Sequence, residues 1–195
     1  MNPRLIGMVA GEASGDFLGA HLISALRSRM PELRFAGIGG PAMEAAGFDS
    51  WYPMERLAVR GYAEVLRHYA GIVSMRRRLA SRMRNAGPAL FIGIDAPDFN
   101  ISLETGLRRT GIRTLHYVSP SLWAWRGGRI RKIARAVDRM LVVFPFEEDL
   151  YRQAGIPVSY VGHPLADAIP DSDQTAIARE QLRISPAREV IAMLP

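Results

Sequence analysis

The 195-residue sequence contains no cysteine. This absence excludes disulfide bonds, zinc–thiolate sites and a cysteine nucleophile. No apolar run approaches the roughly 20 residues that a membrane-spanning helix needs. Residues 1–10 lead directly into a short strand-like run, without the long apolar segment of a signal peptide. Nothing in the sequence therefore argues for secretion or for a membrane-spanning chain.

Lysine is almost absent, because Lys132 is the only lysine among the 25 basic residues. The bias toward arginine reflects either a GC-rich genome or a preference for planar, bidentate donors. With 19 acidic residues, the formal charge is +6. A positive charge of this size is compatible with phosphate ligands, nucleic acid or an anionic membrane surface and does not choose among them.

Two common phosphate-binding motifs are also missing. The sequence has neither the G-x-G-x-x-G pattern of dinucleotide-binding proteins nor the G-x-x-x-x-G-K-[ST] pattern of P-loop ATPases. Their absence disfavours a nucleotide-dependent oxidoreductase. A nucleic-acid-binding protein is disfavoured too, since no recognition motif accompanies the basic residues.

The pattern that is present alternates apolar strand-like runs with helix-like segments. Such alternation is typical of a Rossmann-like α/β fold, with a parallel sheet and helices on both faces. Strands are predicted at residues 5–10, 34–38, 89–94, 113–118, 139–143, 158–161 and 190–194. Helices are predicted at residues 17–30, 62–84, 101–109, 128–136, 147–153 and 175–182.

The length suits one domain, or one domain and the start of another. We predict a Rossmann-like domain over residues 1–165, then a turn-rich linker and a helix over residues 166–187. The apolar segment 188–195 has no element after it. A strand of a parallel sheet needs neighbours and a crossover connection. We therefore predict that this segment is the first strand of a truncated second domain, although it could also be the last strand of this sheet.

The loops after the strands are the candidate ligand-binding segments, because open α/β sheets bind ligands beyond the carboxyl ends of their strands. After the first strand, Ser14 and Gly15 lie in a loop of small residues that opens a helix. This arrangement suits a phosphate or a sugar hydroxyl. The alternative is a plain turn in which Ser14 or Asp16 is the helix N-cap.

A second loop, residues 95–100, places two carboxylates at the end of an apolar strand. Charged groups are costly near a core unless they are used, and a general base for a hydroxyl nucleophile is one such use. Asp98 is the better candidate for the general base, and Asp95 is the better candidate for a structural group that supports the site. The alternative is that Asp98 or Asn100 caps the following helix.

A third loop brings aromatic and cationic residues together. Trp125 and Ser121 lie close in sequence to Arg126 and Arg129. Amphipathic rings suit sugar stacking or a membrane interface, and arginines suit phosphate. The alternative is a loop whose tryptophans pack into the core beneath a solvated basic helix.

The long predicted helix, residues 62–84, has an apolar stripe wider than a core-facing helix needs. The stripe includes Val65, Ile72, Met75 and Leu79, and it is followed by several arginines. Apolar surface with a basic flank is typical of proteins that lie on an anionic bilayer. A helix buried on two sides and a contact in a homo-oligomer are the alternatives.

Six motifs, in order along nearly the whole chain, resemble the lipid-A-disaccharide synthases, membrane-associated glycosyltransferases of Gram-negative lipopolysaccharide assembly. The motifs are residues 10–16 (AGEASGD), 37–41 (GIGGP), 91–100 (FIGIDAPDFN), 116–126 (HYVSPSLWAWR), 144–147 (FPFE) and 161–164 (VGHP). The resemblance implies the N-terminal half of a GT-B architecture, in which two Rossmann-like halves enclose the active site. The sequence has about half of the length expected for the family.

The resemblance also implies a reaction and its participants. UDP-2,3-diacylglucosamine would be joined to 2,3-diacylglucosamine 1-phosphate (lipid X) with inversion, without a metal or another cofactor. Asp98 would be the catalytic base, and the substrate-binding residues would be Ser14, Gly15, Asn100, Ser121, Trp125, Arg126 and Arg129. The protein would be cytoplasmic and peripheral on the inner face of the inner membrane. A non-catalytic acyl-sugar or membrane-binding module is the alternative.

Overall fold

The computed structural model describes residues 4–57, 62–120 and 128–193, without the side chains of residues 62–70 and 168. By its internal contacts the chain divides into two units, Met1–Gly162 and His163–Pro195. The first unit carries the sheet and all of the described candidate site residues.

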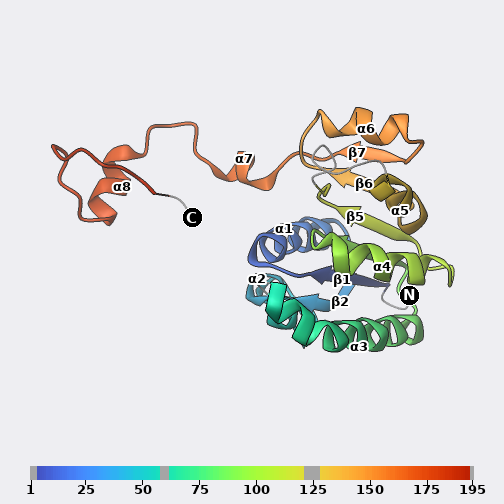
Figure 1. The fold of residues 1–195 in the computed structure, drawn as a ribbon. Helices are drawn as coiled ribbons and strands as arrows, with labels where there is room; N and C mark the ends of the chain where they lie inside the picture. Colours follow the sequence, from blue (N-terminus) through green and yellow to red (C-terminus); the bar gives the residue numbers. More distant parts are fainter. Residues whose placement is uncertain (1–3, 58–61, 121–127, 194–195) are drawn as a thin grey trace. The chain divides into compact units, whose positions relative to one another are not determined.

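A seven-stranded, entirely parallel sheet forms the first unit, with the strand order β3-β2-β1-β4-β5-β6-β7. Figure 1 shows β5, β6 and β7 on one side of β1 and β2. Six of these strands lie where the sequence predicts them, with ends that differ by at most one residue. The strand β3 was not predicted, because its sequence FDSWYP mixes polar, aromatic and proline residues. Such a sequence fits an edge strand. The strands are β1 Leu5–Ala10, β2 Arg34–Gly39, β3 Phe48–Pro53, β4 Leu90–Ile94, β5 Thr114–Tyr117, β6 Arg139–Val142 and β7 Val158–Tyr160.

The helices of this unit follow the strands, as the alternation predicted. Two begin earlier than predicted: α1 starts at Ala13 and α4 starts at Pro97, so both helices begin within the candidate loops. The short α2 and the 3-10 helix η1 were not predicted. The helices are α1 Ala13–Arg29, α2 Pro41–Ala45, η1 Met54–Arg56, α3 Tyr62–Ala86, α4 Pro97–Arg108, α5 Gly128–Ala136 and α6 Glu147–Gln153.

Hydrophobic clusters cover both faces of the sheet. Successive residues of β1 belong to different clusters. Met8 packs in one cluster with Ile23 of α1, whereas Val9 packs in the other with Leu79 of α3 and Leu103 of α4. This division is what the period-two geometry of a strand requires. The prediction of a Rossmann-like parallel sheet with helices on both faces is confirmed.

The apolar stripe of α3 is explained largely by this packing. Met75 and Leu79 are 7% and 0% exposed, and Ile72 packs against the same cluster. Met75 and Leu79 therefore belong to the core, and the expectation that they contact a membrane does not hold for them. The side chain of Val65 lies outside the described residues. Among the described side chains of the helix, the basic Arg77 and Arg78 are exposed, and we call this its basic side.

The second unit contains two short helices, α7 Pro164–Ala168 and α8 Thr175–Gln181. The side chain of His163 accepts a hydrogen bond from the backbone of Leu165, 3.2 Å away. Arg179 donates to the backbone carbonyls of Ser185 and Arg188, at 2.8 and 3.0 Å. Residues 189–193 form neither a strand nor a helix. The boundaries predicted at residues 165 and 187, and the start of a second domain at 188, stay predictions.

Candidate functional site

The site lies where the strand order reverses. From β1 the chain passes outward through β2 and β3, and from β4 it passes outward in the other direction. The loops after β1 and β4 therefore leave neighbouring strands toward opposite sides, and this divergence opens a crevice at their carboxyl ends. These are the loops that carry Ser14, Gly15, Asp95 and Asp98.

The two loops approach each other closely at Gly11. A Cβ atom on Gly11 would lie 2.9 Å from the Cβ of Ala96, shorter than a normal contact between carbon atoms. Gly15 is also buried, since a Cβ there would lie 3.4 Å from that of Ala10 and 3.5 Å from the Ile94 carbonyl oxygen. Ser14 between them is exposed. Glycine at position 11 thus lets the loops meet, whereas the contacts at Gly15 are at ordinary van der Waals distance. Ser14 is the side chain that a ligand can reach.

Strained backbone and a buried amide shape the loop after β4. Asp95 and Ala96 have positive φ angles of 49° and 43°. Non-glycine residues in this conformation cost of order 1–3 kcal/mol each and cluster at functional sites. The fully buried side-chain amide of Asn100 donates to the carbonyl oxygen of Asp95, 2.8 Å away, and lies within 3.4 Å of those of Val9 and Ile94. Asn100 therefore ties the ends of β1 and β4 together from below.

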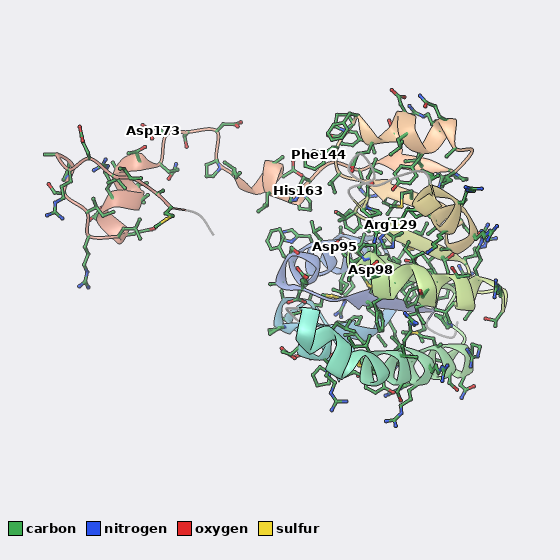
Figure 2. All side chains as sticks on the ribbon, viewed as in Figure 1. Asp95, Asp98, Arg129, Phe144, His163 and Asp173 are labelled. Carbon is green, nitrogen blue, oxygen red and sulfur yellow. The ribbon has the colours of Figure 1, made fainter. Side chains whose placement is uncertain are left out.

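Asp98 is the exposed carboxylate of this loop. It lies in the first turn of α4, where the positive end of the helix dipole favours an anion. Its Oδ1 accepts a 2.7 Å hydrogen bond from Nη2 of Arg129, and its side chain is 90% exposed (Figure 2). An exposed ion pair contributes only about 0–1 kcal/mol to stability. A ligand can therefore exchange with either partner at little cost to the fold.

Asp16 has a structural task. Its buried carboxylate accepts hydrogen bonds from the backbone amides of Gly40, Ala42 and Met43, at 2.8, 2.9 and 3.0 Å. It thereby caps α2 and joins that helix to α1. The N-cap of its own helix is Glu12, without a side-chain hydrogen bond. Asp98 and Asn100 likewise do not cap α4, whose N-cap residue is Ala96.

A buried acid–histidine pair, which was not predicted from the sequence, lies beneath the crevice. Oε1 of Glu104 is 2.8 Å from Nδ1 of His116, and both side chains are 0% exposed. Burial raises the pKa of the Glu104 carboxyl above its ordinary value of 4.5, although His116 opposes the rise. Gly93 has no side chain where this pair packs against β4. The signal in the sequence was the polar Glu104 in the apolar stripe of its helix.

A cavity of about 270 Å³ extends from the ends of β2 and β3. The lining residues include the carboxylates Glu44 and Glu55, the hydroxyl-bearing Ser50 and Tyr52, and Trp51, whose ring lies under the guanidinium of Arg82. Carboxylates and aromatic rings suit a polar ligand that has an apolar face. Gly40, held by Asp16, is part of this lining, so the cavity adjoins the first candidate loop.

The remaining predicted residues lie outside the described residues, namely Ser121, Trp125 and Arg126. Their contribution to the site stays a prediction. Within the described ranges, no cluster of three or more histidine, aspartate or glutamate side chains could hold a metal ion. The exposed rings of Phe144 and Phe146, stacked with centroids 5.6 Å apart, follow β6 at the carboxyl edge of the sheet.

The fold and this site define a Rossmann-like α/β protein with an exposed carboxylate–arginine pair at its topological switch point. A family model described as lipid-A-disaccharide synthetase matches residues 6–195. The chain belongs to the lipid-A-disaccharide synthase family.

Curated relatives support this assignment. Proteins named lipid-A-disaccharide synthase are 56% identical in Dechloromonas aromatica, over 97% of this chain, and 56% identical in Azoarcus sp., over all of it. The relative from Methylobacillus flagellatus is 57% identical over 97% of this chain. The chain spans about half the length of these relatives.

Proposed function

We propose that the chain is the acceptor-side half of an inverting glycosyltransferase of lipid A biosynthesis with the GT-B architecture. The reaction joins UDP-2,3-diacylglucosamine to lipid X and releases UDP, without a metal or another cofactor. The name shared by the relatives supports this assignment. The observation that carries it is the exposed carboxylate of Asp98, beside Arg129 at the crevice.

Asp98 acts as the general base in this proposal. Its exposed oxygens are accessible to the 6-hydroxyl of the acceptor sugar and can remove the proton as the oxygen attacks the anomeric carbon. Attack from the face opposite UDP inverts that carbon. The other half of the protein stabilises the charge that develops on UDP.

Arg129 has two partners in turn. Without substrate it binds Asp98, and with substrate its guanidinium binds the acceptor 1-phosphate, a bidentate partner that arginine favours. The exchange leaves the carboxylate free to accept a proton. Ser14 lines the sugar site, while the buried Gly15 lies behind it against β1 and β4. Asn100 ties the strand ends together beneath the site.

The protein associates with the inner face of the inner membrane in this proposal, because both substrates carry acyl chains. The exposed arginines of α3 support contact with an anionic surface. No helix of the described residues is long and apolar enough to cross a membrane. We expect peripheral binding through the basic side of α3 and through Val65.

The test is a chimera in which this chain replaces the half of the Azoarcus relative that it matches. Asp98→Asn is expected to lower kcat/KM by about 10²–10⁴, the usual contribution of a general base. Asp149→Asn is the matched control, since Asp149 is also an exposed aspartate in the first turn of a helix and paired with an arginine. A loss below about tenfold for Asp98→Asn would remove Asp98 from this role.

The chimera and the isolated chain together distinguish this function from a binding module. We expect the isolated chain to bind lipid X without turnover when both substrates are supplied. If the chimera is also inactive while the chain binds lipid X, the non-catalytic binding module is the better description.

A further inference from the structure

A second cavity, on the α3 side of β3, has a different chemistry from the first. Its volume is about 230 Å³, and it is lined by Tyr52, Arg56, Gly71, Ser74, Met75 and Arg78. One water molecule occupies roughly 30 Å³ in the liquid, so the cavity has room for a phosphate group and several waters. No carboxylate is among the lining residues of the described chain, whereas the first cavity is lined by Glu44 and Glu55.

The helix α3 supplies one wall, and its spacing explains the cavity. Gly71, Ser74 and Arg78 are three and four residues apart, so they lie along one face of the helix. A Cβ on Gly71 would meet no atom of the described residues within 4 Å, so the described part of the chain leaves the space beside it open. Met75 is buried and forms the apolar floor. The glycine thus leaves the space, and the arginine lies one turn beyond the serine.

The opposite wall comes from β3 and η1. Tyr52 contributes a half-buried phenol, and Arg56 contributes an exposed guanidinium. Among the described residues, neither Arg56 nor Arg78 forms a salt bridge with a carboxylate. Two guanidinium groups and two hydroxyl groups thereby surround one cavity without an anion in the described chain to balance them.

We propose that this cavity binds a phosphate monoester. Each guanidinium can donate two parallel hydrogen bonds. Two guanidinium groups together therefore need more acceptor atoms than the two oxygens of one carboxylate. The three terminal oxygens of a phosphate monoester accept from both arginines and from the hydroxyl groups of Ser74 and Tyr52. The site is separate from the Asp98–Arg129 pair, and its test does not depend on glycosyl transfer.

A lipid is the favoured carrier of the phosphate. Arg77, Arg82 and Arg84 are exposed on the same helix and add positive charge around the cavity. A cluster of arginines attracts an anionic membrane surface, with each residue contributing to the attraction. The general attraction brings the surface close, and the cavity takes one headgroup from it. A soluble phosphate ester has the same chemistry, and the experiment distinguishes the two sources.

The first measurement titrates the 195-residue chain with inorganic phosphate and follows binding by NMR. Arg78→Gln and Arg56→Gln are each expected to weaken binding about tenfold or more, as when a charge-assisted hydrogen bond is lost. Arg77→Gln removes the same charge from the neighbouring position, which does not line the cavity, and is expected to change binding less than about twofold. Equal losses for positions 77 and 78 would overturn the proposal.

A third variant tests the cavity without changing its charge. Gly71→Leu places a side chain in the open space and is expected to abolish phosphate binding. Its thermal unfolding midpoint is measured alongside, to show that the variant is folded. Unchanged phosphate binding in a folded Gly71→Leu variant would also overturn the proposal.

Vesicles identify the carrier. Phosphatidylcholine vesicles that contain phosphatidic acid, a monoester, are compared with vesicles of equal surface charge that contain phosphatidylglycerol, a diester. A preference for phosphatidic acid over phosphatidylglycerol that is lost in Arg78→Gln supports a lipid source. Arg77→Gln should weaken sedimentation with both kinds of vesicle to the same extent and keep the preference. Binding of free phosphate without this preference supports a soluble ester. If the chain binds no free phosphate and shows no preference for phosphatidic acid, the site is refuted.

Discussion

The contact between Gly11 and Ala96 gives the sharpest test of how the crevice is built. In Gly11→Ala, the new Cβ would lie 2.9 Å from the Cβ of Ala96. Carbon atoms pack at about 3.5–4.0 Å, so the two loops must separate by roughly 0.6–1 Å. Ala96 is not free to recede, because its carbonyl oxygen accepts hydrogen bonds from the amides of Phe99 and Asn100.

Overpacking of this kind costs about 1–3 kcal/mol. We expect Gly11→Ala to lower the free energy of unfolding by about 2 kcal/mol, within this range. For a chain of this size, that loss lowers Tm by about 4–8 °C. The measurement is denaturant unfolding followed by circular dichroism, with a thermal scan as a second readout.

Two further variants separate this clash from a general effect of alanine. Gly106→Ala is the matched control on α4, where a Cβ meets nothing within 4 Å. It is expected to stabilise the protein by about 0.5–1 kcal/mol, because glycine is unfavourable inside a helix. Ala96→Gly removes the clashing atom and suits the positive φ at that position. In the double variant, Ala96→Gly should restore most of the stability lost in Gly11→Ala.

If Gly11→Ala is neutral, or if the double variant loses as much stability as the sum of the single variants, the loops are not in the tight contact described. The crevice would then have to be wider at the end of β1 than this packing allows.

Two further predictions concern buried carboxylates near the crevice. Burial raises the pKa of the Glu104 carboxyl in the folded state, so the folded protein holds this proton more tightly than the unfolded chain does. The free energy of unfolding therefore falls as the pH rises above 4.5 toward the raised pKa. Glu104→Gln should remove this part of the pH dependence of stability. Urea unfolding across this window measures the slope, and an identical slope in the variant would contradict the assignment. Asp16→Ala removes the acceptor for the amides of Gly40, Ala42 and Met43 and should cost about 1–3 kcal/mol, measured by the same unfolding. A change below about 0.5 kcal/mol would show that water replaces the carboxylate without loss.

The alternation of strands and helices could be predicted because each element carries its own periodicity. Most of the strands are buried, so their apolar runs are continuous and easily recognised. The edge strand β3 escaped because an edge strand is only partly buried and keeps polar residues. The helix α2 escaped because five residues are too few for a periodic pattern.

The candidate site was predicted as a set of loops, and the structure separates the tasks of its members. Asp98 is exposed and paired with Arg129, as a reactive or ligand-binding group must be accessible. Asp16, in an equally polar segment, accepts a hydrogen bond from the amide of Gly40, 24 residues away, at the start of α2. Asn100 is buried beneath strands β1 and β4. Local sequence could not distinguish them, because their partners come from distant segments.

For the long helix α3, the sequence likewise could not show which apolar residues are buried in the core. The stripe containing Met75 and Leu79 is wide enough to suggest a membrane contact, yet both side chains are buried in the core. A helical wheel gives the relative angles of side chains but not the surface that each one meets. The cavity beside Gly71 arises only because β3 and η1 pack opposite that glycine.

The sequence by itself determined the element order, the α/β class and the family, because periodicity and ordered motifs are properties of the chain alone. The tertiary structure alone decided which polar side chains face the crevice and which hold it together. The physical reason is that burial and hydrogen-bond partners depend on contacts between segments far apart in sequence. The fully buried pairing of Glu104 with His116, from different elements, is the clearest case.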